Sequence, residues 1–353
     1  MKKILVLRFS GMGDLALMVP VLRSLVAAHQ HIQVTVVTQP RFAFFFQNID
    51  RVTVFEADID EKFAGFFGVR QLFRALFLTK DFDVVIDLHN HIRTIVLRNL
   101  FKVFGRPVFA LDKGGKEKKA FSRKEKKITR PLPHQVERYQ KVFEKAGYSF
   151  QLLKPPYLIP SDESKKLVEG WFVKKGLKKN EKWIGLAPFA RHKTKIWPTA
   201  NYPKLIDALI KKIPVKFFLY GSGDEEIKYF EDLQQLFPEH IVMVAGRLKL
   251  PQETTLMTHL DLMVCVDSST MHLATMVNTP VLSIWGGSHP DVGWAPFGKG
   301  EESIVQISRV DIACRPCSVY GKETCFRGDF ACLNWITPEM VTERVIGRID
   351  EIK

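Results

Sequence analysis

The stretch "KKILVLRFSGMGDLALMVPVLRSL", residues 2–25, decides the fold. Its first part is an apolar run without the polar alternation of a half-exposed strand, which predicts a buried parallel strand. Gly11, Gly13 and Asp14 follow, and apolar residues then recur at helical spacing over 14–29. A strand that turns into a helix at glycines is typical of doubly wound α/β sheets.

The same alternation of strand and helix patterns continues along the chain. Strands are predicted at 3–9, 32–38, 50–56, 82–88, 182–188, 215–221, 240–244, 260–267 and 280–286, and helices at 62–79, 91–104, 134–147, 163–176, 201–212, 224–236, 251–260 and 337–351. A proline-rich linker at 152–164 separates two similar halves. We therefore expect two α/β, Rossmann-like domains with doubly wound parallel sheets, residues 1–155 and 156–335, and a final helix within 336–353.

Length and composition narrow the class of protein. The 353 residues suit two domains, and 46% hydrophobic with 25% charged residues is typical of a soluble globular protein. The net charge of +14 indicates an acidic partner: nucleic acid, an anionic membrane surface or phosphorylated small molecules. No apolar run has the length of a membrane span or the pattern of a signal peptide, so we expect a cytoplasmic protein with reduced thiols.

The opening turn, Ser10 to Asp14, has the residues of a phosphate-binding or catalytic turn. Its glycines let the backbone bend tightly and approach a ligand. A dehydrogenase with this pattern carries an acid at the end of its second strand, where this chain has Gln39, which disfavours an oxidoreductase. Asp14 itself has two interpretations: it caps or charges the first helical turn, or it acts as a general base.

Three stretches of the second half follow predicted strands, and ligands bind at that edge of open α/β sheets. They are "APFARHKTKIWP" (187–198), "YGSGDEE" (220–226) and "VDSSTMHLA" (266–274). The first offers cations, the second a glycine turn with acids for ribose hydroxyls, and the third a helix start with free N–H groups. Each stretch also has a purely structural interpretation, as a helix cap, a solvated loop or a buried histidine. Together, however, the three stretches predict a nucleotide diphosphate pocket.

These motifs, taken in order, resemble glycosyltransferase family 9, the bacterial heptosyltransferases of lipopolysaccharide core synthesis. The resemblance covers nearly the whole chain. It rests on "ILVLRFSGMGDLALMVPVLRSL" (4–25), "DFDVVIDLHNHIRT" (81–94), "VERYQKVFEKAG" (136–147), "KIWP" (195–198), "YGSGDEE" (220–226), "DLMVCVDSSTMHLATMVNTPVLSIWGGSHP" (261–290) and the cysteine-rich tail that runs into "ITPEMV" (336–341).

The resemblance implies a glycosyltransferase B fold, with two Rossmann-like domains facing a cleft and the last helix packed back on the N-terminal domain. It implies inverting transfer of heptose from ADP-L-glycero-D-manno-heptose to a lipid A-linked inner-core acceptor. The acceptor would bind the N-terminal domain at the turn of Ser10, Gly11 and Gly13, with Asp14 as general base. The implied donor residues are Lys195, Ser268, Ser269, Thr270 and His272 for the phosphates, and Gly221, Asp224, Glu225 and Asp267 for the nucleoside or sugar.

Ser269 departs from the family pattern, which usually has glycine there. A side chain narrows a backbone that approaches the phosphates, so either the turn avoids positive φ or the donor sits differently. One alternative is therefore a family 9 enzyme that uses another nucleotide sugar for a surface polysaccharide. Another is a non-catalytic polyanion-binding protein, although no nucleic-acid motif is present and no nucleic-acid partner is expected.

Two segments have a possible membrane role in the sequence. The basic segment 112–130, with Lys116, Lys118, Lys119, Arg123 and Lys124, would face the acceptor or an anionic membrane, or is a solvated loop. The Phe-rich helix 62–79 packs on the sheet or touches lipid through Phe63, Phe66 and Phe67. We expect a cytoplasmic protein at the inner face of the cytoplasmic membrane, with a nucleotide-sugar donor and a lipid-linked saccharide acceptor.

Four of the five cysteines, Cys314, Cys317, Cys325 and Cys332, lie close together in the sequence. This spacing allows a tetrahedral zinc site, but the second pair is wider than in a zinc ribbon. Packed thiols or a labile disulfide are the alternatives. The expected transfer requires no cofactor, because Lys195 and helix N–H groups would carry the charge of the leaving diphosphate.

Overall fold

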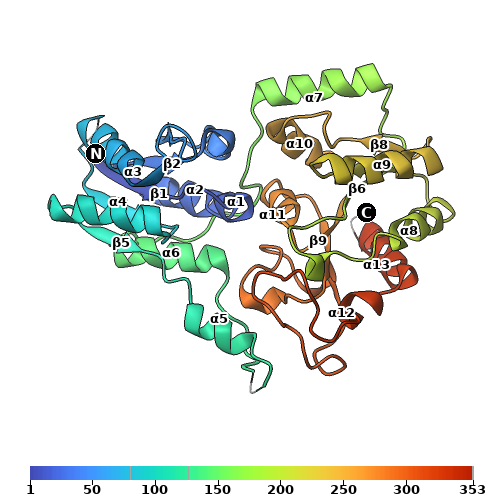
Figure 1. Cartoon of the computed structure of the whole chain (residues 1–353). Coiled ribbons are helices and arrows are strands. Elements are labelled where there is room, and N and C mark those ends of the chain that lie inside the picture. Colours follow the sequence, from blue (N-terminus) through green and yellow to red (C-terminus); the bar gives the residue numbers. More distant parts are fainter. Residues whose placement is uncertain (80, 126, 352–353) are drawn as a thin grey trace. The chain divides into compact units, whose positions relative to one another are not determined.

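The computed structural model describes residues 1–79, 81–125 and 127–351. The chain forms two compact units (Figure 1). Unit 1 comprises Met1–Gly115 and Pro133–Ile159, and unit 2 comprises Lys116–Leu132 and Pro160–Lys353. The expected boundary at 155/156 therefore lies close to the observed one, but the segment 116–132 belongs to the second unit rather than the first.

Unit 1 is built on a parallel sheet with the strand order β3-β2-β1-β4-β5. β1 lies at its centre because residues 4–7 are apolar and fully buried, as a strand covered on both faces requires. The register pairs Leu7 with Val37 of β2 and with Asp87 of β4. The strands are β1 (Lys2–Leu7), β2 (Ile32–Thr38), β3 (Val52–Glu56), β4 (Val84–Asp87) and β5 (Val108–Ala110).

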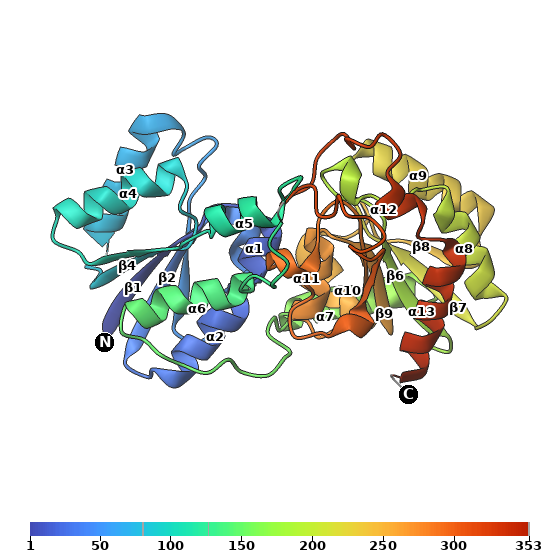
Figure 2. The same ribbon diagram turned by 90° about the horizontal axis from the view of Figure 1, so that it is seen from below.

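Helices cover both faces of this sheet. Figure 2 shows α3 and α4 on one face and α2 and α6 on the other. The predicted helix over 14–29 is divided in two, because Pro20 has no N–H to continue the helical ladder and stands in the first turn of α2. The helices are α1 (Met12–Ala16), α2 (Val19–Ala28), η1 (Pro40–Phe45), α3 (Gly65–Thr79), α4 (Ile92–Val103), α6 (Gln135–Lys145) and, at the unit boundary, α5 (Gly115–Phe121).

Unit 2 repeats the plan with the strand order β11-β10-β9-β6-β7-β8, again all parallel. Its strands are β6 (Lys182–Ala187), β7 (Val215–Leu219), β8 (Ile241–Met243), β9 (Leu262–Val266), β10 (Val281–Trp285) and β11 (Ile304–Gln306). Its further helices are α7 (Asp162–Lys175), η2 (Lys193–Lys195), α8 (Asn201–Ile210), α9 (Asp224–Leu236), α10 (Leu250–Met257), α11 (Ser269–Met276), η3 (Pro290–Val292), η4 (Glu301–Ser303), α12 (Ala331–Asn334) and α13 (Pro338–Glu351).

The last helix differs from the expectation that it packs back on the N-terminal domain. α13 packs against α8 and the sheet of unit 2, and its apolar residues Val341, Val345 and Ile349 belong to the core of that unit. Trp197 anchors the segment before the helix, because its buried indole donates a hydrogen bond of 2.8 Å from Nε1 to the carbonyl of Ile336.

Two strands had no clear signal in the sequence. β5 and β11 have three residues each and lie at sheet edges, with a strand on one side only. A run this short has too few positions to show a period. The basic segment is not a loop throughout either, because α5 occupies part of it and Phe121 packs with Leu132 and Val292 in unit 2; residue 126 lies outside the described residues.

Replacement Trp197→Phe keeps most of the buried apolar volume but leaves the Ile336 carbonyl without its donor. We expect it to lower the free energy of unfolding by about 1–3 kcal/mol, measured by urea denaturation. The matched change Trp335→Phe affects a side chain that is 50% exposed. That variant should stay within about 0.5 kcal/mol of the parent chain. Equal losses in both variants would contradict the anchoring role.

Candidate active site

Each sheet has a point where the strand order reverses, and ligands of open α/β sheets bind there. In unit 1 this point lies between β1 and β4, and in unit 2 between β6 and β9. The opening turn follows β1 and the "DLHNH" segment follows β4, so both meet at one edge. The predicted donor stretches at 187–198 and 266–274 follow β6 and β9 in the same way.

In unit 1, Asp14 is held by a buried arginine. Arg8 directly follows β1, and its Nη2 lies 2.6 Å from Oδ2 of Asp14. Its Nη1 donates a hydrogen bond of 2.6 Å to the Leu88 carbonyl. The Arg8 side chain is 7% exposed and that of Asp14 27%, so the carboxylate remains open to a ligand. The N-cap of α1 is Gly11, not Asp14, which lies in the first turn. Asp14 is therefore not the N-cap, whereas the expectation of an acid in the first helical turn is confirmed.

Gly11 is required by this geometry. Its φ is +88°, which side chains rarely adopt. A Cβ there would also lie 2.9 Å from the Asp14 carboxylate and 3.1 Å from Arg8 Nη2. Gly13 is buried within α1 and Ser10 is half-buried at the turn. Gly11 therefore makes room for the ion pair of Arg8 and Asp14.

A second set of charges supports this pair from β4. The fully buried Asp87 accepts hydrogen bonds from the backbone N–H groups of His89 and Asn90. It also forms an ion pair with Arg98, whose Nη1 lies 2.8 Å from Asp87 Oδ2. Asn90 has a φ of +47°. These contacts fix the loop whose Leu88 carbonyl holds Arg8. Asp87 and Arg98 therefore hold the loop that positions Arg8.

Burial also keeps His89 neutral beside this pair. Its Nδ1 lies 3.5 Å from the Phe9 backbone N–H, and desolvation, followed by the nearby Arg8 charge, lowers its pKa to about 3. Desolvation likewise lowers the pKa of Lys113, with Arg8 contributing. Sequence reasoning missed Arg8, His89 and Lys113. The one available signal was a cation that interrupts the apolar run "ILVLRF".

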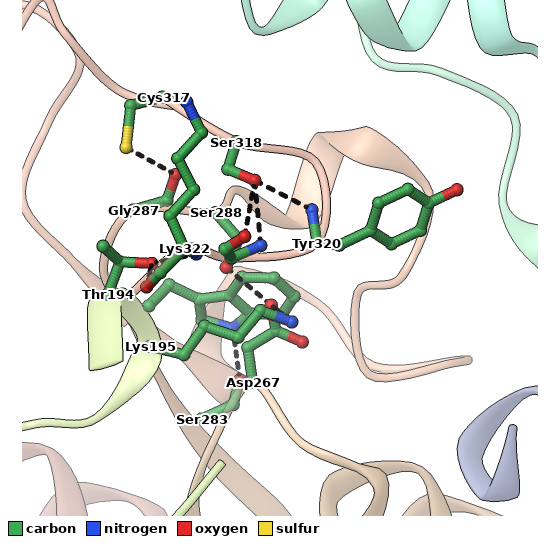
Figure 3. A network of polar contacts seen from close by, with 12 residues as sticks. Thr194, Lys195, Asp267, Ser283, Gly287, Ser288, Cys317, Ser318, Tyr320 and Lys322 are labelled. Atoms are coloured by element: carbon green, nitrogen blue, oxygen red, sulfur yellow. Dashed lines mark hydrogen bonds and ion pairs between the residues drawn. The ribbon is translucent and has the colours of Figure 1, made fainter. Parts of the chain in front are cut away.

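In unit 2, Lys195 and Asp267 meet at the reversal of strand order. Lys195 Nζ lies 2.8 Å from Asp267 Oδ2, and the Ser288 hydroxyl donates to the same oxygen at 2.5 Å (Figure 3). Both members of the ion pair are largely buried, with 15% and 8% of their side chains exposed. The loop that carries Lys195 is fixed because the Thr194 hydroxyl exchanges hydrogen bonds with the backbone of Lys322.

The helix after Asp267 begins in the expected place. Ser268 is the N-cap of α11, but its side chain makes no capping hydrogen bond, and its buried Oγ has no hydrogen-bond partner within the described residues. Ser269 and Thr270 form the first turn, and His272 is buried just behind them. Ser269 is not among the described residues with positive φ, so the turn accommodates serine by avoiding that region. The start of α11 thus leaves polar groups available to an anion.

At the glycine turn, a different acid makes the contact. Asp224 and Glu225 are exposed in the first turn of α9, whereas Glu226 accepts a hydrogen bond of 2.8 Å from the Ser222 backbone N–H. Burial raises the pKa of Glu226. A Cβ on Gly221 would lie 2.4 Å from Glu226 Oε2, which explains the glycine. Sequence reasoning had no means of choosing among three consecutive acids.

The basic segment contains one exception to the expected exposure. Lys116, Lys119, Arg123 and Lys124 are exposed, but Lys118 is buried, with its Nζ 3.9 Å from the centre of the Trp294 ring. Lys118 therefore does not face a membrane or an acceptor, since a cation–π contact within unit 2 holds it. No helix among the described residues is long and apolar enough to cross a membrane.

The cysteine-rich tail supports the donor loop. All five cysteines are free thiols, and within the described part of the chain no three His, Cys, Asp or Glu side chains are grouped to hold a metal ion. Cys317 Sγ lies 3.6 Å from the Gly287 carbonyl. Cys314, Cys325 and Cys332 belong to the same tail. The fully buried Arg315 donates to the carbonyls of Gly286 and Ser288. The tail thus holds the loop that carries Ser288.

Comparisons with known proteins identify similar chains. "Lipopolysaccharide heptosyltransferase 3" of Escherichia coli is 24% identical over 296 residues, covering 81% of this chain and 83% of the relative. The solved glycosyl transferase family 9 structure from Veillonella parvula has a TM-score of 0.77 at 17% identity, covering 99% and 98%. E. coli heptosyltransferase WaaC with ADP-2-deoxy-2-fluoro heptose has a TM-score of 0.66 at 18% identity, covering 98% and 99%.

The fold and class follow from these findings. The two doubly wound units have the glycosyltransferase B fold, as the sequence predicted. The model of glycosyltransferase family 9 (heptosyltransferase) matches residues 69–324, and the chain belongs to that family. It is therefore an enzyme, a glycosyltransferase, and the alternative of a non-catalytic polyanion-binding protein is wrong.

The neutral state of His89 leads to a test in solution. Since its folded pKa of about 3 lies below the unfolded value of about 6.5, protonation favours unfolding, and stability falls as the pH drops from 6.5 toward 3. NMR titration of the imidazole nitrogens should show no protonation of His89 above pH 5. In the His89→Gln variant, the slope of the unfolding free energy with pH should be smaller by up to about 1.4 kcal/mol per pH unit. A midpoint near 6.5 would contradict the burial argument.

Proposed function

We propose that the enzyme transfers heptose from ADP-L-glycero-D-manno-heptose to a lipid A-linked inner-core acceptor of lipopolysaccharide, with inversion at the anomeric carbon. Support comes from the family description, heptosyltransferase, and from a relative that is a lipopolysaccharide heptosyltransferase. The observation that carries the donor assignment is the Lys195–Asp267 ion pair beside the start of α11. A cation, free hydroxyls and helix N–H groups there suit a diphosphate.

The donor residues have distinct roles in this proposal. Lys195 turns from Asp267 toward the diphosphate, and the N–H groups of Ser269 and Thr270 with the Ser268 hydroxyl bind its oxygens. His272 contributes a further hydrogen bond from the same turn. Because negative charge grows on the leaving diphosphate in the transition state, preorganised donors of this kind lower the barrier. Gly221 and the acids Asp224 and Glu225 are proposed to contact the nucleoside or sugar.

Asp14 is proposed to remove the proton of the attacking acceptor hydroxyl. A general base has to be ionised, oriented and open to the substrate. The Arg8 contact of 2.6 Å fixes the direction of the Asp14 carboxylate, and the 27% exposure leaves the carboxylate open. Arg8 thus acts through Asp14 as a positioning residue. Ser10, Gly11 and Gly13 form the acceptor-side turn, and the scheme needs no cofactor because protein groups carry every charge that develops.

The nucleotide and sugar have one specific alternative. Ser269 replaces the usual glycine, so a family 9 enzyme with another nucleotide sugar remains the second candidate. Calorimetric titration with ADP, UDP and GDP and their sugar conjugates separates the two. Selective binding of ADP and ADP-heptose supports heptose transfer, whereas selective binding of UDP or GDP supports the alternative. For location, we propose a cytoplasmic enzyme, peripheral at the inner face of the cytoplasmic membrane, where a lipid-linked acceptor is accessible.

The isosteric replacement Asp14→Asn removes the base but keeps the hydrogen-bonding shape. We expect turnover of ADP-heptose to fall by roughly 10²–10⁴-fold with calorimetric donor affinity nearly unchanged, because the donor binds in unit 2. The control Asp50→Asn changes an exposed carboxylate of unit 1 and should leave both values as they are. Retained turnover in Asp14→Asn would remove this residue from the mechanism.

Replacement Lys195→Met removes the phosphate-binding charge. A hydrogen bond to a charged group contributes about 1.5–3 kcal/mol, so the dissociation constant for ADP should rise roughly ten- to hundredfold. The neighbouring Lys193 is exposed and serves as the matched control through Lys193→Met. If both variants lower the affinity for ADP equally, the general positive charge of the loop, and not a positioned lysine, binds the diphosphate.

A further inference from the structure

Two helices of unit 1 present an unusual surface. α3 and α4 lie side by side on one face of the sheet (Figures 1 and 2), and they pack against each other. The inner stripe of α3, with Leu72, Phe73 and Leu76, is buried in the core beneath. A helix of a soluble domain normally carries polar residues on its other side. α3 does so only in part.

The outer stripe of α3 is aromatic and aliphatic at both ends. Phe66, Phe67 and Leu78 are 68%, 83% and 81% exposed. Residues 67 and 78 are separated by 11 positions, which is close to three full helical turns, so they lie on the same side of the helix. Arg70 and Arg74 are exposed between them along that side. Phe63, the third residue of the lipid-contact hypothesis, is instead buried in the core.

The end of α4 extends this surface. Val103 is 81% and Phe104 54% exposed, and the Phe104 ring lies 5.0 Å from that of Phe77 at the end of α3. Apolar groups of the two helices are therefore continuous at their C-terminal ends. A contiguous exposed patch of this kind marks an interaction site rather than ordinary surface.

The charge on these helices has one sign. Neither α3 nor α4 contains an aspartate or glutamate, whereas Arg70, Arg74 and Lys102 are exposed on them. Two nearby acids outside the helices pair with arginines, Asp60 with Arg93 at 3.7 Å and Asp81 with Arg106. Exposed aromatic and aliphatic side chains interleaved with arginines match an anionic lipid interface, where rings enter the headgroup layer and arginines meet phosphates.

We propose that the outer surface of α3 and α4 docks the enzyme on an anionic lipid bilayer. This surface is formed by Phe66, Phe67, Arg70, Arg74, Phe77, Leu78, Lys102, Val103 and Phe104. The inference rests on the proposed function only in that a lipid-linked acceptor gives the docking a purpose. It assigns the membrane contact to these helices rather than to the basic segment 112–130. That segment lacks exposed aromatic residues, and its Lys118 is buried against Trp294.

The test is co-sedimentation with vesicles of phosphatidylcholine that contain phosphatidylglycerol, compared with pure phosphatidylcholine. The parent chain should bind the anionic vesicles, and binding should weaken as salt rises. The pair Arg70→Gln and Arg74→Gln should lower the partition coefficient roughly tenfold or more, since each arginine near the surface contributes about fivefold. The pair Phe67→Ser and Leu78→Ser should lower it by at least as much.

A matched control comes from α7 of unit 2. Leu167 and Val173 are 50% and 82% exposed there, but α7 also carries Asp162, Glu163 and Glu169. The pair Leu167→Ser and Val173→Ser should leave vesicle binding unchanged. Equal losses from both serine pairs, or no binding of the parent chain to anionic vesicles, would overturn the proposal.

Two further measurements separate the possible failures. If sedimentation equilibrium shows a dimer that the Phe67→Ser, Leu78→Ser pair abolishes, while vesicles are not bound, the surface is an interface between copies and the proposal is wrong. Calorimetric binding of ADP-heptose, measured on the same samples, tests the proposed function independently. If the parent chain binds ADP-heptose but not the anionic vesicles, the docking surface alone is rejected. If the parent chain binds the vesicles but not ADP-heptose, the proposed donor alone is rejected.

Discussion

Parallel pairing of β1 with β4, and of β6 with β9, is the constraint on which both candidate sites depend. Parallel strands end at the same edge, so segments far apart in the sequence are brought together where the strand order reverses. Leu88 and Arg8 lie 80 positions apart, yet they share a hydrogen bond of 2.6 Å. Lys195 and Asp267 meet in the same way in unit 2. The chemistry of each unit is therefore a consequence of sheet topology.

Both sites hold a basic side chain against a carboxylate in a largely buried place. Burying two charges costs solvation free energy, and their attraction offsets this cost only with good geometry and further hydrogen bonds. Asp267 gains such support from Ser288, and Arg8 from the Leu88 carbonyl. Buried ion pairs of this kind contribute little net stability, and they are understood better as preorganised groups for a ligand. Under the proposed function, the group that meets the ligand is the carboxylate in unit 1 and the lysine in unit 2.

The cysteine-rich tail has a structural role that the spacing of its cysteines does not indicate. Its cysteines are spaced like metal ligands, but the buried Arg315 beside them donates to the carbonyls of Gly286 and Ser288. Burial lowers the pKa of this guanidinium to about 10, and it remains charged at neutral pH. The tail therefore holds the loop whose Ser288 contacts Asp267.

The sequence by itself determined the alternation of strands and helices and the two-unit plan, because apolar periodicity and glycine turns are local properties. It also indicated the strand ends that carry the candidate site residues, Asp14 among them, but not whether Asp14 is the N-cap of its helix. Tertiary structure alone decided that Arg8 forms an ion pair with Asp14 and that α13 belongs to unit 2. It also decided that Glu226, rather than Asp224 or Glu225, contacts the glycine turn. These facts depend on contacts between distant segments, and burial, ion pairing and helix packing are set by the space that those segments share.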